Sequence, residues 1–147
     1  MTSKTLPFQA LGPIRLGVSS CLLGQEVRYN GGHVRDDLLL STLGRYVQWV
    51  PVCPEVEVGM GIPRENIRLV GESENPRLVA PKSRTDYTEA MKEWSWSRLA
   101  GLEDSDLHGY ILKKDSPSCG MTRVKVRNEK GMPDRNGVGV FAAILLQ

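Results

Sequence analysis

Three cysteines, Cys21, Cys53 and Cys119, are the residues of this 147-residue sequence with the clearest potential for chemistry. An odd number of widely separated cysteines does not predict a disulfide framework. The sequence also lacks the Cys-x-x-Cys pairs of zinc ribbons and the closely spaced cysteine runs of many iron–sulfur proteins. The spacing by itself therefore leaves open whether these thiols are buried hydrophobic residues or ligands of a metal.

The surroundings of the cysteines are more informative than their spacing. Each cysteine follows a short apolar run typical of a strand, at residues 14–18, 47–52 and 109–112. The flanking Ser-Ser-Cys, Cys-Pro-Glu and Ser-Pro-Ser-Cys-Gly segments are rich in turn-forming residues. In a parallel sheet the carboxyl ends of the strands share one edge, where ligands bind. We therefore expect the three thiols to meet in space.

The segments between these strands indicate how the sheet is built. Residues 36–44 and 85–101 carry apolar side chains near the helical period and predict two helices. Strands that alternate with helices predict an α/β fold, a single domain with a mostly parallel, Rossmann-like sheet and helices on both faces. Residues 66–70 and 77–79 predict a hairpin, and the apolar run 140–145 is interpreted as another buried strand. We expect this domain to span residues 14–147, after a flexible N-terminal segment at residues 1–13.

Composition excludes several classes of protein. With 40% hydrophobic and 24% charged residues the chain is typical of a soluble globular domain, and it has no apolar run long enough to span a membrane. Its first residues do not resemble a secretory signal, so we expect a cytoplasmic location. The formal net charge of +2 is far from that of a strongly basic nucleic-acid-binding protein. Residues 113–135 nevertheless form a locally basic tract, which is either a solvated face or an RNA contact.

Three thiolates in one pocket have two main uses. They bind zinc if a fourth ligand is available, which here would be His33 or His108. Alternatively they hold three irons of a 4Fe-4S cluster and leave the fourth iron open to a substrate. His33 lies in a polar turn and His108 directly before a strand, positions more typical of surface residues than of ligands. A third interpretation, buried free thiols in a structural protein, predicts no metal.

Four longer segments make the chain similar to a known family. These are SSCLLGQEVRYNGGH, VPVCPEVEVGMGIPRENIRLV, GYILKKDSPSCGM and NEKGMPDRNGVGVFAA. Together they resemble the thiouracil desulfidase family, once described only as a domain of unknown function, over residues 15–146. The likeness is strongest to the N-terminal domain of the two-domain thiouridine desulfidases, which act on thiolated uridine in RNA. The resemblance therefore implies that the chain is either a naturally short member of the family or a fragment of a longer, two-domain member, without its further C-terminal domain.

The resemblance also implies a cofactor, a substrate and roles for named residues. It implies a 4Fe-4S cluster held by Cys21, Cys53 and Cys119, with one iron not bound by cysteine. The implied substrate is a thiolated pyrimidine base or nucleoside, free or in tRNA. Catalytic roles fall on Glu55 in the Cys-Pro-Glu motif and on Ser116 in the Ser-Pro-Ser-Cys motif.

The chemistry of these side chains suits that reaction. Replacing C=S by C=O with water needs a soft Lewis acid for the sulfur and a group that accepts a proton. Glu55, two residues after Cys53, is suited to proton transfer, although a solvated carboxylate or a partner for Arg64 is the alternative. Pro117 stiffens the loop that carries Ser116, which is either directed toward the cluster or an ordinary turn serine.

Four further residues near the cysteines are predicted to contact the substrate: Ser20, Lys114, Asp115 and Ser118. The alternative for Lys114 and Asp115 is that they pair with each other in solvent. The competing function is an RNA-binding module in which the basic tract holds the RNA backbone and the cysteines bind a structural metal.

Overall fold

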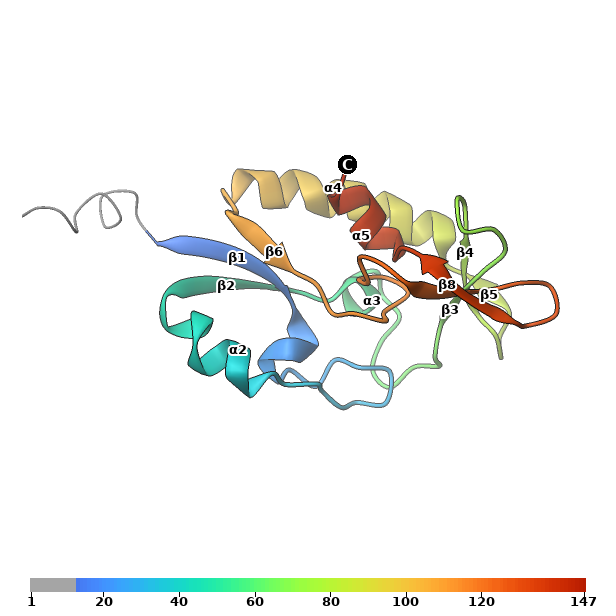
Figure 1. The fold of residues 1–147 in the computed structure, drawn as a ribbon, viewed down its shortest axis with the longest axis horizontal. Coiled ribbons are helices and arrows are strands. Elements are labelled where there is room, and N and C mark those ends of the chain that lie inside the picture. Colours follow the sequence, from blue (N-terminus) through green and yellow to red (C-terminus); the bar gives the residue numbers. More distant parts are fainter. Residues whose placement is uncertain (1–12) are drawn as a thin grey trace, which may run out of the picture.

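A three-stranded parallel sheet forms one half of the fold (Figure 1). Its central strand β1 (Ile14–Ser19) pairs with β2 (Val47–Val52) on one side and with β6 (Gly109–Ile111) on the other. Because both pairings are parallel, all three strands end at the same edge. The computed structural model describes residues 13–147, so the predicted flexible segment lies, apart from Pro13, outside the described residues.

A second, mixed sheet follows along the chain. Its strands are arranged in the order β5 (Thr85–Asp86), β4 (Arg77–Ala80), β3 (Arg68–Val70), β7 (Val124–Arg127) and β8 (Pro133–Gly137). The β3–β7 pairing is parallel and the other pairings are antiparallel. The antiparallel β3–β4 pair confirms the predicted hairpin. The second sheet as a whole was not predicted, because its strands are short and come from distant parts of the sequence.

Helices flank the parallel sheet, which confirms the α/β class. In Figure 1, α4 (Thr88–Asp104) and α5 (Val140–Leu145) lie on one side of this sheet and α2 (Asp37–Ser41) lies on the other. The predicted helix at 36–44 is an α-helix only over α2, capped by the side chain of Asp36, and continues as the 3-10 turn η2 (Leu43–Arg45). The predicted helix at 85–101 begins three residues later, since Thr85 and Asp86 pair as β5.

The prediction of a strand at residues 140–145 is wrong, because this run forms the helix α5. A short apolar run does not distinguish a buried strand from a buried helix. The decisive interactions are tertiary: the first backbone N–H groups of this helix donate to carbonyls of the loop between β6 and β7. The pairs are Gly139 to Gly120 (2.8 Å), Val140 to Pro117 (3.0 Å) and Ala142 to Ser118 (3.1 Å). The loop thus satisfies donors that every helix start leaves without an intrahelical partner.

The helices close two hydrophobic clusters. One lies between the second sheet, α4 and α5, and includes the fully buried Leu69, Leu78 and Met91. The other lies under the parallel sheet, where the Phe141 ring packs against Trp94 and Tyr110 with centroid distances of 5.3 and 5.8 Å. No helix within residues 13–147 has the length and apolar character needed to cross a membrane.

Replacing Gly139 by alanine is expected to destabilise the fold at the contact between α5 and the β6–β7 loop. An added Cβ would lie 2.5 Å from the carbonyl carbon of Ser118 and 2.8 Å from the backbone nitrogen of Cys119. Because these are backbone atoms, the loop must shift, and overpacking of this kind costs about 1–3 kcal/mol. Thermal unfolding of the iron-free protein measures the effect. As a control, Gly101→Ala in α4 has only a side-chain atom at 3.9 Å and should unfold no earlier than wild type.

Candidate active site

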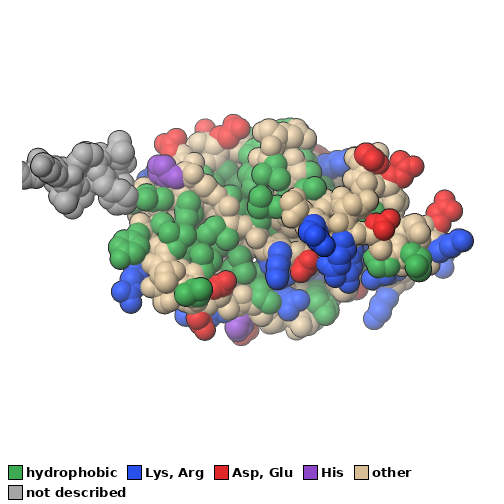
Figure 2. Space-filling view, viewed as in Figure 1, with side chains coloured by type: hydrophobic (Ala, Val, Ile, Leu, Met, Phe, Trp, Pro, Cys, Tyr) green, Lys and Arg blue, Asp and Glu red, His purple; other side chains and the backbone are tan. Residues whose placement is uncertain are grey.

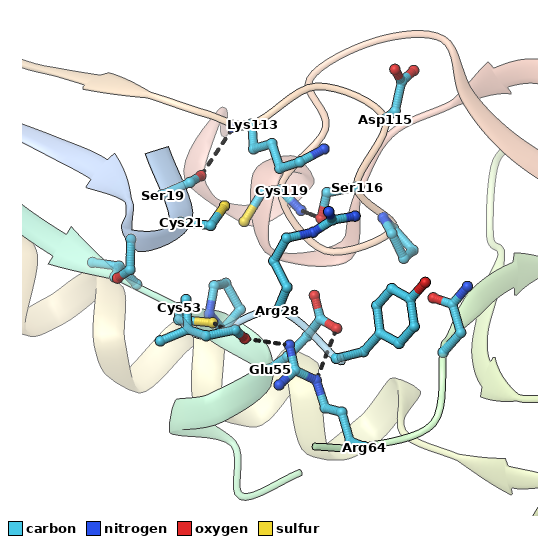
Figure 3. Close-up of a pocket in the computed structure, with 17 residues that line it drawn as sticks. Ser19, Cys21, Arg28, Cys53, Glu55, Arg64, Lys113, Asp115, Ser116 and Cys119 are labelled. Atoms are coloured by element: carbon cyan, nitrogen blue, oxygen red, sulfur yellow. Dashed lines mark hydrogen bonds and ion pairs between the residues drawn. The ribbon is translucent and has the colours of Figure 1, made fainter. Parts of the chain in front are cut away.

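The three cysteines line one cavity at the carboxyl edge of the parallel sheet (Figure 3). Cys21 lies in the 3-10 turn η1 (Ser20–Leu23) directly after β1. Cys53 is the N-cap residue of the single-turn helix α3 (Pro54–Glu57) after β2. Cys119 lies in the loop between β6 and β7. The cavity has a volume of about 310 Å³.

Burial keeps the free thiols neutral. Desolvation raises the pKa of Cys21 and of Cys53 above the ordinary thiol value. Cys119 is more deeply buried, and desolvation raises its pKa to about 12. A metal that binds these side chains must therefore displace their protons.

Hydrogen bonds to the Ser116 side chain hold the loop that carries Cys119. Ser116 Oγ accepts the backbone N–H of Cys119 at 3.0 Å and that of Ser118 at 3.2 Å. The backbone N–H of Gly120 donates to the Ser116 carbonyl at 2.9 Å. Ser116 also lines the cavity, so the residue that orders this loop borders the cavity as well.

The Glu55 carboxylate is held at both of its oxygens. Its Oε1 lies 3.3 Å from Nε of Arg64, and its Oε2 accepts the Ser118 hydroxyl at 3.2 Å. Only 5% of the Arg64 side chain is exposed, and its other nitrogens donate to the carbonyls of Gly61 and Val27, both at 2.8 Å. Glu55 lines the cavity as well. From the sequence, pairing with Arg64 was the alternative to a catalytic role for Glu55. In the structure the same residue both pairs with Arg64 and lines the cavity.

The four predicted substrate contacts are placed differently from one another. Ser20 lines the cavity. Asp115 also borders it, but its carboxylate points away from the cysteines in Figure 3 and lies 3.7 Å from Nη1 of Arg135. Lys114 does not line the cavity, whereas the preceding residue, Lys113, does. Ser118 is fully buried behind the cavity wall and contacts Glu55 rather than the cavity.

The two histidines lie outside the cavity lining. His33 Nδ1 accepts the backbone N–H of Arg35 at 3.1 Å, and His108 Nδ1 accepts that of Arg15 at 3.0 Å. Neither residue therefore supplies the fourth ligand that a zinc site with the three cysteines requires. Within residues 13–147 no three Cys, His, Asp or Glu side chains are close enough to hold one metal ion.

A family model described as 2-thiouracil desulfurase matches residues 16–147. The chain belongs to this family. This confirms the resemblance drawn from the sequence motifs. The uncharacterized protein YbbK of Bacillus subtilis (strain 168) is 33% identical over 135 residues, which cover 88% of each chain. A solved structure of the 4Fe-4S-dependent thiouracil desulfidase TudS superposes with a TM-score of 0.68 at 29% identity, and the match covers 90% of this chain and 85% of that one.

In this member of the 2-thiouracil desulfurase family the cavity has several lining residues that sequence reasoning missed: Ser19, Arg28, Tyr29, Asn66 and Lys113. Arg28 points into the cavity in Figure 3, and its guanidinium carbon lies 5.8 Å from the centroid of the Tyr29 ring. Both residues belong to the first of the four family-like segments. The sequence did contain a signal for these two residues: a basic residue lies next to an aromatic residue within a segment that resembles the family.

The basic tract is divided between two neighbouring places. Lys113 lines the cavity of the cysteines, whereas Lys125, Arg127 and Arg135 line an adjoining cavity of about 390 Å³ together with Arg68. Figure 2 shows basic side chains gathered near the loop between β6 and β7. The cavity of the cysteines thus has positive charge on one flank.

Proposed function

We propose that this chain is a 4Fe-4S-dependent desulfidase that replaces the thiocarbonyl sulfur of 4-thiouracil or 4-thiouridine, free or in tRNA, by oxygen from water. One observation carries the proposal: three cysteines, Glu55 and Ser116 line a single cavity in a member of the 2-thiouracil desulfurase family. The structural relative described as a 4Fe-4S-dependent thiouracil desulfidase supports the cofactor. A cytoplasmic location stays a prediction.

The donor set fits the cluster better than a single metal ion. Thiolates are the ligands that iron–sulfur clusters prefer. A single metal ion needs its ligands to converge on one point, and the described residues offer no such group of three. A cluster does not need this convergence, because Cys21, Cys53 and Cys119 would each bind a different iron. With three cysteine ligands, one iron is left without a cysteine.

When bound, the cluster supplies a soft Lewis acid that binds sulfur and draws electron density from the neighbouring ring carbon. The carboxylate of Glu55 accepts a proton from the water that attacks this carbon. Arg64 keeps that carboxylate in place by pairing with Oε1. The planar side chains of Arg28 and Tyr29 offer surfaces for stacking a pyrimidine ring. The C=S bond is replaced by C=O without electron transfer, and the sulfur leaves as sulfide.

A second candidate function is an RNA-binding module, for which the zinc site expected from the sequence lacks a histidine ligand, because neither His33 nor His108 lines the cavity of the cysteines. The basic side chains that line the adjoining cavity favour this alternative. If they hold an RNA backbone, binding of tRNA should weaken steeply as salt increases. Colour separates the two candidates when the protein is purified without oxygen, because an iron–sulfur cluster is brown and a zinc site is colourless.

Anaerobic reconstitution with iron and sulfide tests the proposed function directly. The loaded protein is mixed with 4-thiouracil or 4-thiouridine, and the thiocarbonyl absorbance is followed while sulfide is assayed. We expect this absorbance to fall with equimolar release of sulfide. If a cluster forms but both compounds stay intact, 4-thiouridine in tRNA is the remaining substrate to assay. If tRNA is also unchanged, or if no cluster forms, the proposed function is wrong.

A further inference from the structure

Ser118 connects two residues of the cavity from behind its wall. The side chain is fully buried, with an exposed fraction of 0%. Its Oγ lies 3.2 Å from Oε2 of Glu55 and 3.1 Å from Oγ of Ser116. Both of these partners line the cavity, whereas Ser118 does not. The three side chains therefore form a continuous hydrogen-bonded path that begins and ends at the cavity.

The backbone determines the direction of this path. Ser116 Oγ already accepts the N–H groups of Ser118 and Cys119. A hydroxyl oxygen has two lone pairs and one proton, so the remaining capacity of Ser116 is to donate. Its partner is Ser118 Oγ, which in turn donates to Glu55 Oε2 at 3.2 Å, because this oxygen is closer and a stronger acceptor than the Cys119 sulfur at 3.9 Å. In the resting protein the hydroxyl protons thus point from Ser116 to Ser118 and from Ser118 to Glu55.

The path is fixed at both of its ends. Arg64 pairs with the other oxygen of Glu55 and is itself anchored on two backbone carbonyls, so Oε2 keeps facing Ser118. At the other end, Ser116 Oγ is held by the backbone N–H groups of Ser118 and Cys119. In the middle of the path, the N–H of Ala142 in α5 donates to the carbonyl of Ser118 at 3.1 Å. A hydrogen-bonded chain held in this way is suited to proton transfer, because its oxygen atoms stay in place and only the two hydroxyl hydrogens must turn.

We propose that Ser118 relays a proton from Glu55 to Ser116 during desulfuration, an inference that rests on the proposed function. Glu55 takes a proton from the attacking water. Ser116 turns its hydroxyl to the departing sulfur and gives up its proton, while Ser118 turns its hydroxyl from Glu55 to Ser116 and passes its own proton on. In the same step Glu55 gives its proton to Ser118. The C=S double bond is replaced by a C=O double bond, one proton of water passes along the path to the sulfur, which leaves as hydrosulfide, and the second proton of water is released to solvent. All three side chains return to their starting state.

Replacing Ser118 by alanine tests the relay. The variant keeps the backbone bonds of the loop and the pairing of Glu55 with Arg64, but it interrupts the path between Glu55 and Ser116. We expect the visible spectrum of the cluster and KM to stay as in wild type, while kcat falls about 10²-fold, a typical loss for an acid–base step. Ser95→Ala is the matched control. Ser95 is also a fully buried serine, but its hydroxyl donates to the Met91 carbonyl within α4.

Two measurements report on the path itself rather than on the stability of the protein. Infrared difference spectra of wild type and Glu55→Gln identify the carboxylate bands of Glu55 in the iron-free protein. These bands should shift in Ser118→Ala and stay in place in Ser95→Ala. The second measurement is the single-turnover rate of the loaded wild type as a function of the D₂O fraction. A relay that moves several protons together gives a curved dependence, which becomes a straight line in Ser118→Ala.

The outcomes separate failure of the relay from failure of the proposed function. If wild type releases no sulfide from any thiopyrimidine substrate, the proposed function is wrong. If wild type is active and the loaded Ser118→Ala variant keeps its kcat, only the relay is wrong. Should the variant fail to fold or to load, the wild-type dependence on D₂O decides, and a straight or flat line overturns the relay.

Discussion

Replacing Cys119 by alanine is expected to abolish cluster binding and desulfidase activity together. Cys119 is 5% exposed and lines the cavity with the other two cysteines. Without its thiolate only two protein ligands remain, and the cluster loses its third point of attachment. Iron and acid-labile sulfide per chain, together with the visible spectrum after anaerobic reconstitution, measure the loss. The same result is expected for Cys21→Ala and for Cys53→Ala.

An isosteric variant separates loss of a ligand from loss of packing. Cys119→Ser keeps nearly the same volume in the buried site but replaces a soft sulfur by a hard oxygen. We expect it to unfold at the temperature of the iron-free wild type and still to lack a cluster. Full iron content and turnover in any one of the cysteine variants would remove that residue from the ligand set. If wild type itself binds no metal, the interpretation of buried free thiols takes precedence.

Replacing Glu55 by glutamine is expected to leave the cluster intact and to lower kcat by about 10²–10⁴-fold. Glutamine has the same size and can still accept from Arg64, but it cannot take a proton from water. Alanine is a poorer test. Glu55→Ala removes the carboxylate and leaves the buried guanidinium of Arg64 without its charged partner. Breaking a buried ion pair in this way lowers the free energy of unfolding by about 3–5 kcal/mol.

Single-turnover sulfide release, with cluster content determined on the same samples, measures the effect of Glu55→Gln. Glu72→Gln is the control for loss of a negative charge, because Glu72 is exposed in the turn between β3 and β4 and should leave turnover unchanged. A Glu55→Gln variant that works at the wild-type rate with a full cluster would exclude Glu55 as the proton acceptor.

Local signals were sufficient for much of the fold. The three parallel strands before the cysteines, the β3–β4 hairpin and helix α4 all follow from apolar periodicity and turn residues over a few positions. Local signals failed at residues 140–145, where the apolar run has no polar residues to reveal its period. There the loop carbonyls of residues 117, 118 and 120 decide in favour of a helix by accepting its first N–H groups.

The sequence by itself determined which side chains have the chemistry for the site: three thiols that each follow a strand, a carboxylate two residues after Cys53, and a serine three residues before Cys119. Only the tertiary structure decided how they are connected. Ser118 and Glu55 are 63 residues apart in the chain, yet their side chains share a hydrogen bond at 3.2 Å. Periodicity and turn chemistry describe neighbours along the chain, whereas this hydrogen bond, the anchoring of Arg64 and the burial of Cys119 arise where distant segments exclude water together.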